Sequence, residues 1–288
     1  MEMGRRSLSA TLRAVTMQAM DTTRFEAARS ALVDARRGAA AIEHWPAAWL
    51  PADLAEAYRL QAAVAAGLGR IGGWKVAAVT DEQRRSLAVP RPIGAPIMSA
   101  WMRDASTGPA ELRAADFIAA KLECEFAFEL GRDLPPRPDA PYTRAEVEAA
   151  VVAMRMAIEV VDSRLPRGLG ALAELADAFN NGGFVAGPRL ADWRLLTFAE
   201  IGIVLNVGGG RGGSDMTELA VGSGAAILSG DPFATVVMLA NAQPEGSGGL
   251  KAGHIVTTGS CTGAPWLPGP GLYRAEFTGL GSVELRVV

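Results

Sequence analysis

The chain has 288 residues, of which 49% are hydrophobic and 20% are charged, and its formal net charge is −3. This composition is ordinary for a globular protein, and the small negative charge argues against nucleic acid or an anionic membrane as partner. No apolar run approaches the ~20 residues of a membrane helix, no secretory signal is evident, and two cysteines make no disulfide framework, so we expect a cytoplasmic protein.

Two residue types are scarce enough to constrain catalysis. Histidine occurs only at positions 44 and 254, which disfavours a histidine pair or a histidine-rich zinc site. Lysine occurs only at positions 75, 121 and 251, whereas arginine is frequent. An ammonium group has a pKa that its surroundings can tune, unlike a guanidinium, so each lysine is a candidate site residue. Chance retention in an arginine-biased chain explains any one of them equally well.

Residues 21–90 are predicted to form a helical N-terminal cap that follows a flexible extension over residues 1–20. A capping box opens a helix over residues 23–37, and apolar residues share one of its faces. A second helix is predicted over residues 53–69, where glycines end it. Short β-type segments then begin near Gly72.

Residues 91–288 are predicted to form a β-rich catalytic core. Strands dominate from residue 117, with helices over residues 143–154 and 232–242. The glycine run at 208–213 has no GK[ST] sequence and no capped helix after it, so a hairpin loop is preferred to a nucleotide loop. Without repeats or an alternating βαβ pattern, the fold class is α+β.

The segment Phe117–Leu130 alternates with a period of two and predicts a strand. Glu123 and Glu125 share one face, ~6.5–7 Å apart at Cα. Two like charges so placed repel each other unless water screens them or a hard cation such as Mg²⁺ or Mn²⁺ lies between them. From this strand alone, a solvated face is the preferred interpretation.

A third glutamate changes that balance. Glu159 lies in an apolar segment that reads as a buried strand, and a lone buried carboxylate needs a cation, a proton or a lysine. Close by, Asp162 and Arg164 are expected to satisfy one another in a structural role.

Five short motifs resemble, in order, those of the 2-keto-4-pentenoate hydratase and 4-oxalocrotonate decarboxylase branch of the fumarylacetoacetate hydrolase superfamily. The resemblance covers about residues 25–288 and implies a β-rich mixed barrel or roll core of that family's type. The motifs are Gly73-Trp-Lys75-Val, Glu123-Cys-Glu125-Phe-Ala-Phe, Glu159-Val-Val-Asp-Ser-Arg164, Gly230-Asp-Pro-Phe, and Leu250-Lys-Ala-Gly-His-Ile-Val-Thr-Thr-Gly-Ser260.

The resemblance implies one Mg²⁺ or Mn²⁺ ion held by Glu123, Glu125 and Glu159, with Lys75 as the catalytic residue. A 2-oxo acid would chelate the ion through its carboxylate and 2-oxygen, and the ion would stabilise the enolate. Lys75 beside the metal is expected to have a lowered pKa and to move a proton, although a structural ion pair is the alternative. Lys121 is expected to balance charge and Lys251 to lie in a turn. The expected substrate-binding residues are Thr258, Gly259, Ser260, Asn180 and Asn181.

The chain departs from the family pattern around the substrate. An acidic residue that usually follows the active-site lysine is missing, or is replaced by Asp81 or Glu82. Amides at positions 180 and 181 replace hydroxyls, and Phe179 joins the pocket. His254 stands where the family has an aspartate. These changes affect proton transfer and substrate placement rather than the metal ligands.

The leading functional hypothesis is a hydratase of 2-hydroxypenta-2,4-dienoate or a relative, as in aromatic catabolism. A 2-oxo-3-hexenedioate decarboxylase follows closely, because it needs no water-activating acid. An acylpyruvate hydrolase is third, and a catalytically weak subunit docked onto a sister enzyme is the non-catalytic alternative. We expect a homo-oligomer in each case.

Overall fold

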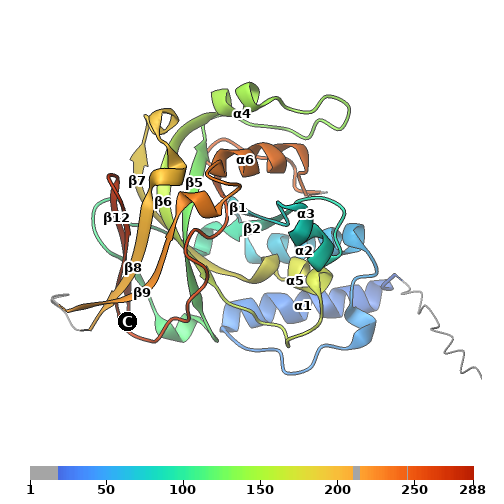
Figure 1. Cartoon of the computed structure of the whole chain (residues 1–288). Coiled ribbons are helices and arrows are strands. Elements are labelled where there is room, and N and C mark those ends of the chain that lie inside the picture. Colours follow the sequence, from blue (N-terminus) through green and yellow to red (C-terminus); the bar gives the residue numbers. More distant parts are fainter. Residues whose placement is uncertain (1–18, 210–214, 245) are drawn as a thin grey trace, which may run out of the picture.

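The computed structural model describes residues 19–209, 215–244 and 246–288. Most of the predicted N-terminal extension and of the glycine run at 208–213 lies outside the described residues. The α-helices of the described part are α1 (Thr22–Gly38), α2 (Leu54–Leu68), α3 (Asp81–Leu87), α4 (Arg144–Ala150), α5 (Ala171–Ala176) and α6 (Pro232–Asn241) (Figure 1). The predicted helices near residues 23–37, 53–69 and 232–242 are confirmed.

Three helix predictions need correction. The helix expected over 143–154 ends at Ala150, because the β-branched residues Val151 and Val152 begin a strand. The helix α3 lies where only β-type segments were expected, and the capping box of Thr80 and Gln83 marks its start. The helix α5 was also missed; its N-cap is Gly170, which provides no side-chain hydrogen bond to signal the start.

A seven-stranded sheet runs through the centre of the molecule. Its order is β2 (Ile93–Met98), β1 (Ile71–Ala77), β10 (Ile255–Thr257), β5 (Lys121–Leu130), β6 (Val151–Val161), β7 (Asn181–Leu190) and β3 (Met102–Asp104). The strand predicted from residue 117 thus begins at Lys121. The strands β1 and β2 lie on either side of residue 90 and pair with each other, so the predicted cap and core share this sheet.

A five-stranded sheet packs against it, in the order β4 (Ala110–Leu112), β12 (Gly281–Val287), β11 (Gly271–Phe277), β8 (Gly202–Gly208) and β9 (Met216–Ser223). Phe126 of β5 makes edge contacts with Phe198 and Phe277, with ring centroids 4.9 and 5.5 Å apart. Phe128 packs in the same way on Phe233, at 5.2 Å. One face of β5 therefore fills the core, which leaves the glutamates on the other face, as the alternation predicted. The α+β class with a β-rich core is confirmed.

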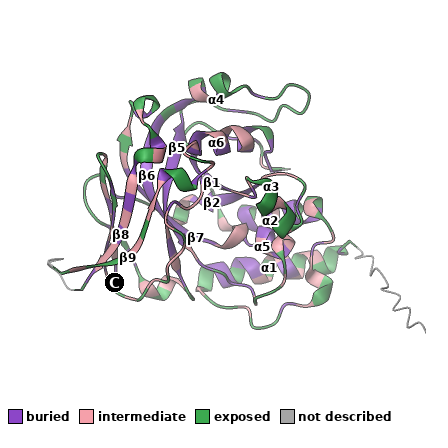
Figure 2. Cartoon of the chain, viewed as in Figure 1, coloured by how far each residue is buried: buried purple, intermediate pink, exposed green. Residues whose placement is uncertain are grey.

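The helices α1, α2 and α5 pack together beside the sheets (Figure 1), and their inner faces are buried (Figure 2). Leu32, Leu60 and Ala173 are fully buried in this small core. Arg36 of α1 reaches the main sheet, where it donates hydrogen bonds to the carbonyls of Asn181 and Gly182 at 2.7 and 2.8 Å. The cap is therefore tied to the start of β7. Within the described residues, every helix is too short or too polar to span a membrane.

Candidate active site

Three glutamate side chains from adjacent strands converge in the seven-stranded sheet. Glu123 and Glu125 belong to β5, and Glu159 of β6 lies directly opposite Glu123 in the antiparallel register. One carboxylate oxygen of each lies within 4.8 Å of the other two. Oxygen ligands at this spacing suit a hard divalent cation, so the three side chains form a candidate metal centre.

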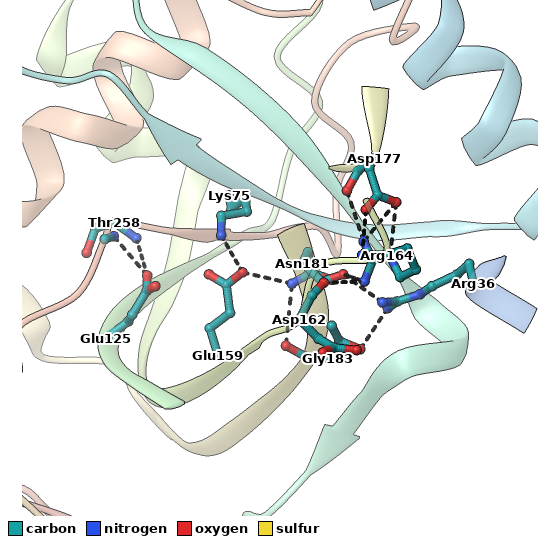
Figure 3. Close-up of polar contacts among 12 residues, drawn as sticks. Arg36, Lys75, Glu125, Glu159, Asp162, Arg164, Asp177, Asn181, Gly183 and Thr258 are labelled. Atoms are coloured by element: carbon teal, nitrogen blue, oxygen red, sulfur yellow. Dashed lines mark hydrogen bonds and ion pairs between the residues drawn. The ribbon is translucent and has the colours of Figure 1, made fainter. Parts of the chain in front are cut away.

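The hydrogen bonds of the two most buried glutamates leave one oxygen unsatisfied. Glu125 accepts backbone N–H bonds from Thr258 and Gly259 at 3.1 and 2.8 Å, both on Oε2. Glu159 accepts on Oε1 from Asn181 Nδ2 at 3.0 Å (Figure 3). Its buried Oε2 has no hydrogen-bond partner among the described residues. An unsatisfied buried carboxylate oxygen is costly, and a cation in the cluster would satisfy it.

Lys75 contacts the same cluster from β1. Its Nζ lies 2.6 Å from Glu159 Oε1, and the side chain is buried. The short strand β10 separates β1 from β5, so the long lysine side chain reaches across one strand to the glutamates. This contact is the ion pair that one interpretation predicted, and it also puts the ammonium beside the candidate metal centre.

Crowded charges shift the pKa values of the metal-free site. Burial raises the pKa of Glu123 to about 7; Lys75 opposes this rise and Glu159 adds to it. Burial likewise raises the pKa of Glu125 well above its ordinary value, with the two other carboxylates adding to the rise. For Lys75, burial alone would lower the pKa, but Glu159 and Glu123 outweigh it and the pKa is raised. The sequence predicted a lowered pKa for Lys75 beside a metal. Such a lowering therefore requires the positive charge of a bound cation.

The cluster borders a cavity of about 430 Å³, a size that suits a small ligand. The charged residues of its described lining are Lys75, Glu123 and Glu125. Its other polar side chains are Thr80, Gln83, Asn180, Thr258 and Ser260. Its larger apolar side chains are Val76, Val79, Leu87, Val161, Phe179, Ile227 and Leu228. Apart from Phe179, these apolar residues were missed, because only the folded chain brings their segments together.

The structure separates the two asparagines that the sequence placed together. Four of the predicted substrate-binding residues line the cavity: Asn180, Thr258, Gly259 and Ser260. Asn181 is outside the lining, 1% exposed, with its amide on Glu159. Its backbone carbonyl accepts hydrogen bonds from Arg36 and Arg164 at 2.7 and 2.9 Å. Asn181 is therefore placed to orient a predicted metal ligand.

Two turns of the cavity wall hold non-glycine residues in the left-handed region. The φ angle is 51° at Ala178, 48° at Phe179, 62° at Asn180 and 44° at Leu228. Each such residue costs about 1–3 kcal/mol, so the surrounding packing must hold these turns in place. The ring centroid of Phe179 lies 5.9 Å from Lys75 Nζ. The wall beside the cluster is thus built from strained, fixed turns.

Several residues considered from the sequence lie outside the cavity lining. Asp81 is ion-paired with Arg84, and neither Asp81 nor Glu82 lines the cavity. Lys121 Nζ lies over the ring of Trp266, 4.5 Å from its centroid. Lys251 pairs with Asp133 at 3.3 Å, and His254 accepts a hydrogen bond from the indole of Trp74.

The predicted pairing of Asp162 with Arg164 is wrong. Arg164 forms a buried ion pair with Asp177 at 3.0 Å. With Asp162 it makes one hydrogen bond, which it donates to the backbone carbonyl and not to the carboxylate. The Asp162 carboxylate instead accepts backbone N–H bonds from Ile118 and Ala119. Sequence proximity suggested the partner, but the backbone turns between the two residues.

No family model matches the chain. It is 32% identical over 145 residues to the 4-oxalocrotonate decarboxylase of Pseudomonas putida, which covers 50% of this chain and 52% of that protein. The chain thus spans about half the length of this decarboxylase. It likewise spans 47% of the 4-oxalocrotonate decarboxylase of Pseudomonas sp. strain CF600. It is 29% identical over 281 residues to the TodF product hydratase of Pseudomonas putida strain F1, covering 93% of this chain and 97% of that protein.

Solved structures share the fold. The 4-oxalocrotonate decarboxylase of Pseudomonas putida G7, complexed with calcium and acetate or with magnesium and adipate, has a TM-score of 0.76 at 22% identity. The match covers 94% of this chain and 100% of that chain. A putative isomerase of Escherichia coli has a TM-score of 0.51 at 18% identity. The chain is therefore similar to a hydratase over nearly its full length and to two decarboxylases over about half of it, and it shares the fold of a decarboxylase of known structure.

Proposed function

We propose that the chain is a divalent-metal-dependent lyase acting on a small 2-oxo or 2-hydroxy-dienoic acid, and that it resembles 2-keto-4-pentenoate hydratase in its reaction. The main support is the convergence of three carboxylates, one with an unsatisfied buried oxygen, beside Lys75 and a small cavity. The all-oxygen donor set favours Mg²⁺ or Mn²⁺. Calcium and magnesium are bound in the decarboxylase of the same fold.

Glu123, Glu125 and Glu159 would hold a divalent cation, which would supply an electrophile for the chemistry of a 2-oxo acid. In hydration of 2-hydroxypenta-2,4-dienoate, C5 gains a proton as the 2-hydroxyl loses one, and water then adds oxygen to C4 and a proton to C3. Lys75 Nζ is placed to hold or move one of these protons. Asn181 donates a hydrogen bond that orients Glu159, and the ring of Phe179 lies near the lysine, 5.9 Å from Nζ to the ring centroid.

A decarboxylase is the second candidate. Among the described lining residues, the titratable groups are Lys75, Glu123 and Glu125, so a separate acid for water addition is lacking there. Decarboxylation of 2-oxo-3-hexenedioate breaks the C5–C6 bond and releases C6 as CO₂, which requires no activated water. An acylpyruvate hydrolase is less well supported, because no histidine occurs in the described lining.

Turnover with defined substrates tests the proposal. The purified chain is freed of metal, supplied with Mg²⁺ or Mn²⁺, and mixed with 2-hydroxypenta-2,4-dienoate or 2-oxo-3-hexenedioate while the ultraviolet absorbance is followed. We expect metal-dependent loss of the dienoate without CO₂ release. Release of CO₂ from the enedioate would instead establish the decarboxylase.

Two controls accompany this assay. Glu125→Gln should abolish turnover of either substrate, because it removes one of the three proposed metal ligands. Turnover that persists in EDTA would contradict the metal-dependent class altogether. Metal binding without any turnover would favour the non-catalytic alternative, a catalytically weak subunit that docks onto a sister enzyme.

A further inference from the structure

We propose that the cavity selects 2-oxo acids whose far end is uncharged and apolar, and discriminates against those that end in a second carboxylate. This inference rests on the proposed function, because it takes the 2-oxo acid head to lie at the glutamate cluster. It concerns the opposite end of the substrate, for which the sequence provided no expectation.

The charges of the lining are all at one place. Lys75, Glu123 and Glu125 belong to the cluster that would hold the metal and the substrate head. The rest of the described lining is uncharged. Large apolar side chains come from three separate segments: Val79 and Leu87 around α3, Phe179 before β7, and Ile227 and Leu228 before α6. A second carboxylate would therefore meet only apolar groups and uncharged polar side chains such as Thr80, Gln83 and Asn180 in the described lining, and no cation.

Arg84, which follows the lining residue Gln83 in the chain, is engaged elsewhere. Arg84 donates hydrogen bonds to the carbonyls of Ala78 and Val79 at 3.0 and 2.9 Å and pairs with Asp81. The guanidinium of Arg84 is therefore hydrogen-bonded to the backbone of two lining residues, and Arg84 itself is not part of the lining.

The arginines behind the cluster are occupied in the same way. Arg36 and Arg164 are buried and bind backbone carbonyls at the start of β7. Lys121 lies over Trp266. Turning any of these cations into the cavity would break contacts that the fold uses.

The net charge of the site supports the same conclusion. Three carboxylates, one ammonium and one divalent cation sum to zero, so the carboxylate of the substrate head already makes the site negative. A second carboxylate would add charge without a cationic partner among the described lining residues. An unpaired polar group in such a place weakens binding by roughly 10- to 100-fold.

The wall is fixed rather than adaptable. Phe179 and Leu228 both have left-handed backbone conformations, with φ of 48° and 44°. Non-glycine residues keep a left-handed conformation only where the surrounding packing holds them firmly in it. A rearrangement that admits solvent around a distal carboxylate would have to displace these turns.

The test compares two ligands that differ only at the far end, 2-oxohexanoate and 2-oxoadipate. Their dissociation constants are measured by titration calorimetry with the full chain in Mg²⁺. We expect 2-oxohexanoate to bind roughly 10- to 100-fold more tightly. Equal binding of the two acids, or tighter binding of 2-oxoadipate, would overturn the inference. If neither acid binds, or if EDTA leaves binding unchanged, the proposed function fails and the inference fails with it.

A charge introduced into the wall provides the second arm. Leu228→Arg should narrow or reverse the preference, because it supplies the missing cation, and Leu87→Arg serves the same purpose if the first variant does not fold. The matched control is Leu195→Arg, at a side chain that is 83% exposed and outside the lining. An unchanged preference in both folded wall variants, or the same shift in the control, would also refute the proposal.

Discussion

Replacing Asn181 by alanine tests how the fold positions a metal ligand. The Asn181 amide donates to Glu159 Oε1 at 3.0 Å, and Lys75 Nζ contacts the same oxygen at 2.6 Å. The substitution removes one of two donors, so Glu159 keeps a partner but loses the contact that restricts its rotation. Loss of such an outer contact typically costs 10- to 100-fold in metal affinity, and because Lys75 remains we expect about 10- to 30-fold.

The assay is calorimetric titration of Mg²⁺ or Mn²⁺ into the metal-free chain, with urea unfolding measured in parallel. The stability of the variant should fall by about 1–3 kcal/mol, because a buried charged acceptor loses a donor. Asn180→Ala is the matched control, since this neighbouring side chain lines the cavity and is not hydrogen-bonded to Glu159. If Asn181→Ala binds metal as tightly as the unmodified chain, or if Asn180→Ala weakens binding equally, the positioning role is refuted.

Three further outcomes are expected. Lys75→Met should lower turnover by about 100-fold or more while metal still binds in calorimetry, and retained turnover would leave the lysine with only a structural role. The raised Glu123 pKa, about 7, favours the protonated carboxyl in the folded protein. The metal-free chain should therefore lose stability as the pH rises from ~4.5 through about 7, which thermal melts in EDTA can follow; Glu123→Gln should flatten this slope, and an unchanged slope would contradict the reasoning. Asp177→Asn should destabilise the fold by about 3–5 kcal/mol in urea unfolding, because it leaves the Arg164 guanidinium buried without its counter-ion, and a neutral effect would count against that pair.

Local patterns predicted much of the candidate site. The alternation along β5 placed Glu123 and Glu125 on one face, and the apolar surroundings of Glu159 indicated a buried carboxylate in need of a partner. The structure brings these three together because β5 and β6 pair with Glu123 opposite Glu159. That register depends on the sheet as a whole, so the sequence supported the convergence only through the resemblance to a family.

Long-range contacts account for what the sequence could not predict. Arg164 pairs with Asp177 rather than with Asp162, because the chain returns through α5 before it enters β7. The roles of Asn180 and Asn181 diverge because a left-handed turn directs successive side chains to different places. The apolar wall combines segments more than a hundred positions apart, so no local pattern reveals that its described lining residues include no cation outside the cluster.

The position of a bound ion tests the central claim most directly. Crystals of the chain grown with Mn²⁺ and a 2-oxo acid would locate the metal by its anomalous signal. We expect one ion, bonded to an oxygen of each of Glu123, Glu125 and Glu159 and to the carboxylate and 2-oxygen of the ligand. An ion bound elsewhere, or a cluster in which Lys75 alone neutralises the three glutamates at saturating Mn²⁺, would contradict the proposed metal centre.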